Sequence, residues 1–298
     1  MSVPGVAFPG QGNARETARA GLQRQESHPL VRAAMKLVGG ASAVLDLNLN
    51  DTAVAQPMTY ALGLAAVSSA GARDAPLAVG HSLGELTAAA FLGAVDPEEG
   101  LHLAARRGQI CAEQQRRRPG AMAAVMGTDA SGVEMLRRLV VGRTGAVLEI
   151  AGLNGRRQTV VSGDMSAMAE LEATSAELGL LVNRLPIGGA FHSPLMVEAI
   201  EEWSGLLQAA GFRDTTVPLV STVDAAVHTS GEEMRELLRR ALLLPVRWAE
   251  ALRTVVALGV DQLWDAGPGT TLARLARREG VVSFVDTAHE SAAQVTAS

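Results

Sequence analysis

The segment at 75–92 constrains the fold of this chain more than any other part of the sequence. A short apolar run at 76–79 is typical of a buried parallel strand, and it leads directly into Gly-His-Ser-Leu-Gly at 80–84. This motif fits the nucleophile elbow G-x-S-x-G, in which a serine lies on a tight turn between a strand and a helix. The alanine-rich residues 85–92 predict that helix. We interpret Ser82 as a nucleophile; the competing interpretation is a glycine-rich turn whose serine only caps the helix.

Length, charge and cysteine content narrow the class of protein. With 298 residues, 48% of them hydrophobic, the chain can bury the core of one large α/β domain with a smaller domain inserted. A formal charge of −5 argues against a nucleic-acid partner, which would need a basic surface. Cys111 is the only cysteine, so neither an internal disulfide nor a zinc–cysteine cluster can form.

The sequence also argues against a membrane protein. The start of the chain lacks the charged and apolar segments of a signal peptide. The uncharged stretch at 52–72 is long enough to span a membrane, but Gln56 and Pro57 lie within it. We therefore predict a buried helix leading into the elbow strand, in a cytoplasmic protein without a membrane partner.

The order of predicted elements between 121 and 185 indicates a separate unit. Strands and helices follow there as β-α-β-β-α-β, which is the order of a ferredoxin-like unit. We predict an α/β core with a parallel sheet at 1–123 and 191–298, and a ferredoxin-like subdomain at 124–190.

Three helix predictions bear on the site. Asp96 is expected to cap a helix that ends in a charged loop at 116–120. Gly108 lies inside this helix, where glycine costs about 1 kcal/mol relative to alanine, so we expect another element to approach it closely. A further helix is predicted at 231–244.

The glycine-rich turn at 9–13 follows a predicted strand at 3–8. Loops at the carboxyl ends of neighbouring parallel strands converge on one crevice. An elbow serine needs two backbone N–H donors for its oxyanion hole, one of them from a loop after another strand. Gln11 is therefore a candidate second donor, although a simple turn would also explain this sequence.

His192 is the candidate base. It lies in a glycine-rich turn just before a helix, at the junction between the predicted subdomain and the core, whereas His81 belongs to the elbow itself. A single histidine is often structural, and the order of serine and histidine along a chain differs between unrelated folds. The local sequence leaves a catalytic and a structural role equally open.

Taken together and in order, the motifs resemble one family, the malonyl-CoA:acyl-carrier-protein transacylases of fatty-acid and polyketide synthesis. The matching stretches span nearly the whole chain and lie at 8–12, 56–57, 80–85, 107–108, 120–125, 189–193, 245–248 and 267–269. The resemblance implies an α/β-hydrolase-like core that carries a ferredoxin-like insertion.

The resemblance also implies a role for each matching residue. Ser82 becomes the nucleophile and His192 its base, and the backbone N–H groups of Gln11 and Leu83 become the oxyanion hole. The substrate-binding residues implied are Arg107, which pairs with a malonyl carboxylate, Phe191, which malonyl-selecting members tend to carry, and His81 of the elbow.

The sequence departs from the family pattern at four positions. The histidine of the family is oriented by a main-chain carbonyl, which would here come from Ala241, where glutamine is usual. Cys111 replaces a usual methionine, and Asn13-Ala14 stands in place of Ser-Gln. These departures leave the reaction type unchanged and bear on the acyl group and the carrier.

The resulting prediction is a monomeric acyltransferase that uses acyl-CoA as a substrate and an acyl carrier protein as its partner, with no metal and no bound cofactor. It transfers a malonyl-type group through a Ser82 ester. The alternatives are an acyl hydrolase that clears carrier proteins, transfer of a different acyl group between carriers, and an inactive scaffold that only binds a carrier. Intact Ser82, His192 and Arg107 argue against the scaffold.

Overall fold

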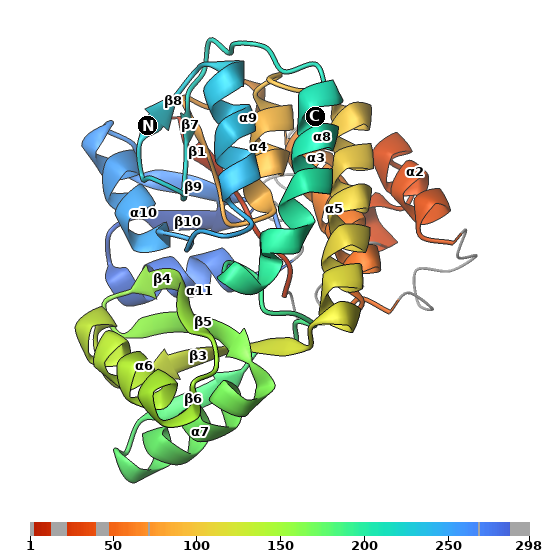
Figure 1. The fold of residues 1–298 in the computed structure, drawn as a ribbon. Helices are drawn as coiled ribbons and strands as arrows, with labels where there is room; N and C mark the ends of the chain where they lie inside the picture. Colours follow the sequence, from red (N-terminus) through yellow and green to blue (C-terminus); the bar gives the residue numbers. More distant parts are fainter. Residues whose placement is uncertain (1–2, 13–22, 40–47, 71, 268, 287–298) are drawn as a thin grey trace.

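A computed structural model of the chain describes residues 3–12, 23–39, 48–70, 72–267 and 269–286, and it contains two sheets (Figure 1). The larger is six-stranded with the order β10-β9-β1-β2-β7-β8. Its strands are β1 (Gly5–Phe8), β2 (Ala78–Gly80), β7 (Leu219–Val220), β8 (Val227–His228), β9 (Gln262–Asp265) and β10 (Ser283–Asp286). All neighbouring strands are parallel except β7 and β8.

Both faces of this sheet are buried, because alternating side chains of the strand β1 pack into two different hydrophobic clusters. Val6 and Phe8 of β1 pack into one hydrophobic cluster, whereas Ala7 between them packs into another. The first cluster is completed by α2 (Pro29–Leu37), α3 (Thr52–Ala70), α4 (Gly84–Phe91), α5 (Pro97–Arg117), α8 (Ile200–Ala209) and α9 (Gly231–Arg240). The second is completed by α10 (Trp248–Ala257) and α11 (Thr271–Glu279). The predicted α/β core with a parallel sheet is confirmed.

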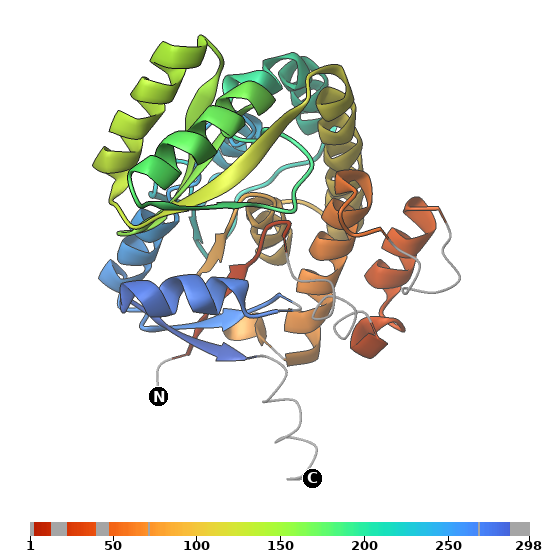
Figure 2. The same cartoon turned by 90° about the horizontal axis from the view of Figure 1, so that it is seen from below.

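The second sheet is formed by the inserted segment. Its order is β4-β5-β3-β6, and its elements are β3 (Gly120–Met126), α6 (Ala130–Thr144), β4 (Leu148–Gly155), β5 (Gln158–Asp164), α7 (Met165–Glu177) and β6 (Leu181–Arg184). This is the predicted ferredoxin-like arrangement. Both helices cover its outer face, away from the core (Figures 1 and 2). Strand β3 already begins at Gly120, and the domain limits at 123/124 and 190/191 stay a prediction.

Backbone hydrogen bonds join the inserted sheet to the segment of the core that precedes α10. The N–H of Leu153 in β4 donates to the Val246 carbonyl at 2.8 Å, and the N–H of Val246 donates to the Ala151 carbonyl at 3.0 Å. On the inner face of the small sheet, Met122 and Ala124 pack into the same hydrophobic cluster as Val6 and Phe8. The insertion is therefore a fixed wall of the crevice above the large sheet.

Two helix boundaries differ from the prediction. The helix capped by Asp96 runs on to Arg117, so most of the predicted loop at 116–120 is absent. The predicted helix at 231–244 ends at Arg240, and the residues at 241–244 form a turn instead. This early end leaves carbonyl groups of the turn available to residues outside the helix.

The predicted buried helix before the elbow is confirmed as α3, which carries Pro57 in its interior. Within the described residues, no helix is both long and apolar enough to cross a membrane.

A Cβ atom on Gly108 of α5 would lie 2.7 Å from the Thr52 carbonyl oxygen of α3. The two helices therefore approach as closely as we predicted, and glycine is required there. Asn13 and Ala14 lie outside the described residues, as does Pro268.

Candidate active site

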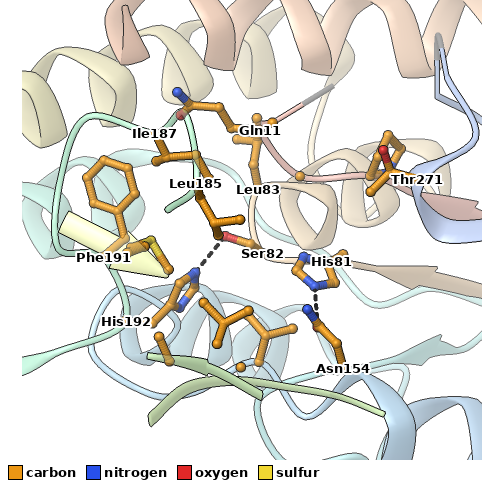
Figure 3. Close-up of a pocket in the computed structure, with 18 of the residues that line it drawn as sticks. Gln11, His81, Ser82, Leu83, Asn154, Leu185, Ile187, Phe191, His192 and Thr271 are labelled. Atoms are coloured by element: carbon orange, nitrogen blue, oxygen red, sulfur yellow. Dashed lines mark hydrogen bonds between the residues drawn. The ribbon is translucent and has the colours of Figure 1, made fainter. Parts of the chain in front are cut away.

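The segment around Ser82 has the geometry of a nucleophile elbow. Ser82 lies between β2 and α4 with a φ of 55°, a left-handed conformation that side chains rarely adopt. A Cβ atom on Gly80 would lie 2.1 Å from the Gly84 carbonyl carbon, so no larger residue fits at this turn. The strained turn projects the Ser82 hydroxyl into the crevice above the carboxyl ends of the strands (Figure 3).

Ser82 and His192 meet although they are far apart in the sequence. The Ser82 Oγ lies 2.8 Å from His192 Nε2 (Figure 3). On the other side of the ring, Nδ1 lies 3.0 Å from the Leu244 carbonyl oxygen. Because a carbonyl can only accept, Nδ1 carries the proton and Nε2 is left as the acceptor for the serine hydroxyl. The arrangement is that of a serine with its general base.

The carbonyl that orients His192 is not the one expected from the resemblance. We expected Ala241, but the hydrogen bond goes to Leu244, three residues further along. The Ala241 carbonyl makes a weaker contribution that raises the pKa of the same imidazole. The reason lies in the early end of α9, which turns the Leu244 carbonyl toward the ring.

The electrostatic environment keeps His192 neutral. The ring is only 5% exposed. Burial, reinforced by the positive charge of Arg107, lowers the pKa of His192 to about 3. The imidazole is therefore neutral at neutral pH, and its Nε2 carries no proton.

The loop after β1 lies beside the elbow, as predicted. The N–H of His81 donates to the Phe8 carbonyl at 2.9 Å, and the Gln11 side chain donates to Thr52 Oγ1 at 3.1 Å. Both Gln11 and Leu83 line the same pocket as Ser82 (Figure 3). In the described part of the chain, no backbone carbonyl accepts a hydrogen bond from the N–H of either residue. These donors are positioned for an oxyanion hole, and that role stays a prediction.

Arg107 is a buried cation that lines the pocket. Its side chain is 6% exposed, and Nη1 donates to Gln56 Oε1 at 2.8 Å. Among the described residues, no carboxylate forms an ion pair with it, and Glu85 acts on it only at longer range. Cys111 lies one helical turn further along α5 and interacts with both Arg107 and Gln56. A guanidinium buried in this way is a site for a small anion.

The pocket around these groups has a volume of about 170 Å³, which suits a short acyl group. Phe191 forms part of its wall next to Leu185 and Ile187 (Figure 3). The predicted site residues that line it together are Gln11, His81, Ser82, Leu83, Arg107, Phe191 and His192.

Asn154 was not recognised from the sequence. It lies at the end of β4 in the insertion, and its Oδ1 accepts a hydrogen bond from His81 Nε2 at 3.0 Å (Figure 3). The Trp248 ring packs against His81 at a centroid distance of 5.5 Å. The insertion thus holds the residue next to the nucleophile, and an asparagine in a strand carries no local signal for such a contact.

A second buried network was also missed. Glu85, directly after the elbow, accepts hydrogen bonds from Ser221 Oγ at 2.9 Å and from Thr222 Oγ1 at 2.8 Å, and also from the Thr222 backbone N–H. Burial raises the pKa of this carboxyl group. Thr222 Oγ1 lies 3.0 Å from the Gly80 carbonyl as well, so the network ties the elbow to the end of β7.

Comparison with known proteins agrees with this geometry. The model of the acyl transferase domain family matches residues 22–291. The malonyl CoA-acyl carrier protein transacylase of Bacillus subtilis is 30% identical over 294 residues, covering 93% of this chain and 90% of that protein. The solved structure of malonyl-CoA:acyl carrier protein transacylase from Xanthomonas oryzae has a TM-score of 0.85 and 29% identity, covering 100% of this chain and 98% of that one. A malonyl-transacylase solved in complex with its type II PKS acyl-carrier protein has a TM-score of 0.83 and 26% identity, covering 96% of each chain.

The fold and the site define an α/β protein with a serine on a nucleophile elbow. The match over nearly the whole chain identifies it further: the chain belongs to the acyl transferase domain family and is an acyltransferase.

Proposed function

We propose that the protein transfers a malonyl group from CoA to the phosphopantetheine thiol of an acyl carrier protein, through an ester on Ser82. The observation that carries this proposal is the buried guanidinium of Arg107, which forms no ion pair with any carboxylate of the described residues and lines the pocket that also holds Ser82 and His192. A malonyl thioester brings a free carboxylate into that pocket, and a guanidinium meets a carboxylate with two parallel hydrogen bonds.

In the proposed first half-reaction, the Ser82 Oγ attacks the thioester carbonyl. Its proton passes to His192 Nε2, while Nδ1–H remains bound to the Leu244 carbonyl. The backbone N–H groups of Gln11 and Leu83 stabilise the negative oxygen of the tetrahedral intermediate. When the intermediate collapses, the C–S bond breaks and the imidazolium gives its proton to the departing CoA thiolate, which leaves as the thiol.

In the second half-reaction, the thiol of the carrier's phosphopantetheine attacks the Ser82 ester. His192 takes the thiol proton and gives it back to the serine oxygen. The complex of a malonyl-transacylase with its acyl-carrier protein, which has the same fold, supports the choice of partner. Every step uses side chains and backbone groups of this chain, so the proposal requires neither a metal nor a bound cofactor.

The closest alternative is an acyl hydrolase with the same Ser82–His192 pair, in which water replaces the thiol. A hydrolase of this kind does not need a buried cation. Transfer of a different acyl group between carriers is the second alternative, and Arg107 argues against any acyl group without a negative charge.

The deciding experiment is to incubate the protein with malonyl-, methylmalonyl- and acetyl-CoA and to measure the mass of the acyl-enzyme. Malonyl-CoA should add one malonyl group, and Ser82→Ala should add none. The isolated malonyl-enzyme should persist in buffer and discharge rapidly when a phosphopantetheinylated carrier protein is added. Equal discharge with and without the carrier would establish the hydrolase, and an unchanged adduct in the alanine variant would remove Ser82 from the mechanism.

A further inference from the structure

The carboxyl group of Glu85, in the first turn of α4, is enclosed by the core directly behind the elbow. The residue is only 1% exposed. Its Oε1 contacts Ser221 Oγ, Thr222 Oγ1 and the Thr222 backbone N–H, whereas Oε2 is buried and has no hydrogen-bond partner among the described residues. No cation in the described part of the chain forms an ion pair with it. An ionised carboxylate would be costly in this position.

The hydroxyl group of Thr222 lies between two oxygen atoms. Its Oγ1 is 2.8 Å from Glu85 Oε1 and 3.0 Å from the Gly80 carbonyl oxygen. A threonine hydroxyl has one proton to donate, and both a carbonyl and an ionised carboxylate can only accept. If Glu85 were ionised, these two contacts would have to compete for a single proton.

A proton on Glu85 Oε1 satisfies all of these contacts. The contact with Thr222 then reverses, so that the carboxyl group donates to Thr222 Oγ1 and the Thr222 hydroxyl donates to the Gly80 carbonyl. The remaining lone pairs of Oε1 accept from the Ser221 hydroxyl and from the Thr222 N–H. The hydrogen-bond geometry therefore favours a neutral carboxylic acid.

The electrostatic surroundings of Glu85 agree with this geometry. The buried titratable groups in the elbow and in the elements packed around it are His81 in the elbow, Tyr60 on α3, Arg107 and Cys111 on α5, and Asp224 in the turn after β7. The buried face of α9 is apolar. Burial raises the pKa of Glu85 and outweighs the hydrogen bonds from Thr222 and Ser221, which lower it; the charge of Asp224 raises it further.

The charge of Glu85 matters for Arg107. An ionised Glu85 would act on the Arg107 guanidinium through the protein interior, where charges are weakly screened. It would then be a second negative charge near the same cation, and it would disfavour a carboxylate that arrives with the substrate. A neutral Glu85 leaves the positive charge of Arg107 uncompensated.

We propose that Glu85 is a neutral carboxylic acid that donates its proton to Thr222, and that this neutrality lets Arg107 select a negatively charged acyl group. Glu85 does not line the acyl pocket, so it is a positioning residue that acts on the substrate through Arg107. The second part of the proposal rests on the proposed function, whereas the first part concerns the protein alone.

Infrared difference spectroscopy tests the proton directly. Subtracting the spectrum of Glu85→Gln from that of wild type at neutral pH should reveal the carbonyl band of a protonated carboxyl group, which shifts in heavy water. Glu202→Gln is the matched control, because Glu202 is exposed and pairs with Arg106; this variant should keep the band. Carboxylate bands in place of the carbonyl band would overturn the proposal. The measurement needs no substrate, so its result is independent of whether malonyl-CoA acylates Ser82.

The ratio of the acylation rates with malonyl-CoA and acetyl-CoA tests the effect on Arg107. A carboxyl group with a raised pKa is neutral below that pKa and ionises as the pH rises through it. In wild type the ratio should stay constant while the infrared band persists and fall at least about fivefold where the band disappears. Glu85→Gln cannot ionise and should keep its ratio constant over the same range, with circular dichroism confirming the fold.

A merely structural Glu85 would change both rates equally, and the ratio would not follow the band. A constant ratio while the band disappears would therefore overturn the role in selection. A ratio that falls in Glu85→Gln as well would also overturn it, since the change would then belong to another group near Arg107, such as the Cys111 thiol.

Discussion

The two faces of α5 each carry an arginine, under opposite conditions. Arg107 is buried and donates to Gln56, whereas the neighbouring Arg106 is exposed and pairs with Glu202 at the surface. Water and salt screen an exposed charge, and a buried one is screened far less. The difference indicates that Arg107, and not its neighbour, can select a charged acyl group in the pocket.

The largest effect is expected in the pocket, at His192. Replacing it with alanine removes the acceptor of the serine proton, and loss of a general base slows a reaction by about a hundredfold to ten-thousandfold. Rapid-quench acylation of His192→Ala by malonyl-CoA, read by intact mass, measures this loss. Discharge of a pre-formed acyl-enzyme should slow as well.

Arg106→Ala is the reference for this measurement, because Arg106 lies outside the pocket and the maximal rate of this variant should equal that of wild type. Near-normal acylation by a folded His192→Ala protein would leave His192 a structural residue.

The next effect distinguishes a charged acyl group from a neutral one. Removing one partner of a buried charge pair costs about 2–4 kcal/mol, so Arg107→Ala should slow acylation by malonyl-CoA about 30- to 1000-fold. Acetyl-CoA has no carboxylate to pair and should be spared. Parallel acylation rates with the two donors give this ratio.

Arg106 is the matched control for this substitution. It is the neighbouring residue on α5, but its guanidinium is exposed and pairs with Glu202 at the surface. Arg106→Ala should leave the ratio of malonyl to acetyl unchanged. Equal losses with both donors in Arg107→Ala, or a larger change in Arg106→Ala, would contradict the assigned role.

The smallest change is expected with pH. A histidine with its ordinary pKa of about 6.5 would be largely protonated at pH 5.5, and acylation would fall about tenfold from its value at pH 7.5. Burial and Arg107 lower the pKa of His192 to about 3, so the neutral base persists throughout this range. The single-turnover rate should therefore vary by less than about twofold between pH 5.5 and 7.5, with circular dichroism confirming the fold. A midpoint near pH 6.5 would contradict the buried environment described for the ring.

The parts of the molecule that were predicted correctly depend on local patterns. The elbow was recognisable because Gly80, Ser82 and Gly84 are adjacent in sequence and each serves the same turn. The β-α-β-β-α-β order of the insertion was recognisable because apolar periodicity is a property of each segment alone. The end of α9 was misjudged, since the residues at 241–244 have the composition of a helix but form a turn in the structure.

By itself, the sequence determined the strand–turn–helix at Ser82, the two-sheet architecture and that some element closely approaches Gly108, because short-range sterics and periodic burial dictate these features. The tertiary structure decided which carbonyl orients His192, that Asn154 of the insertion holds His81, and that no carboxylate among the described residues pairs with Arg107. These contacts join residues far apart in the chain. Their distances and burial are set only when both sheets and the helices between them have packed, and no local pattern encodes them.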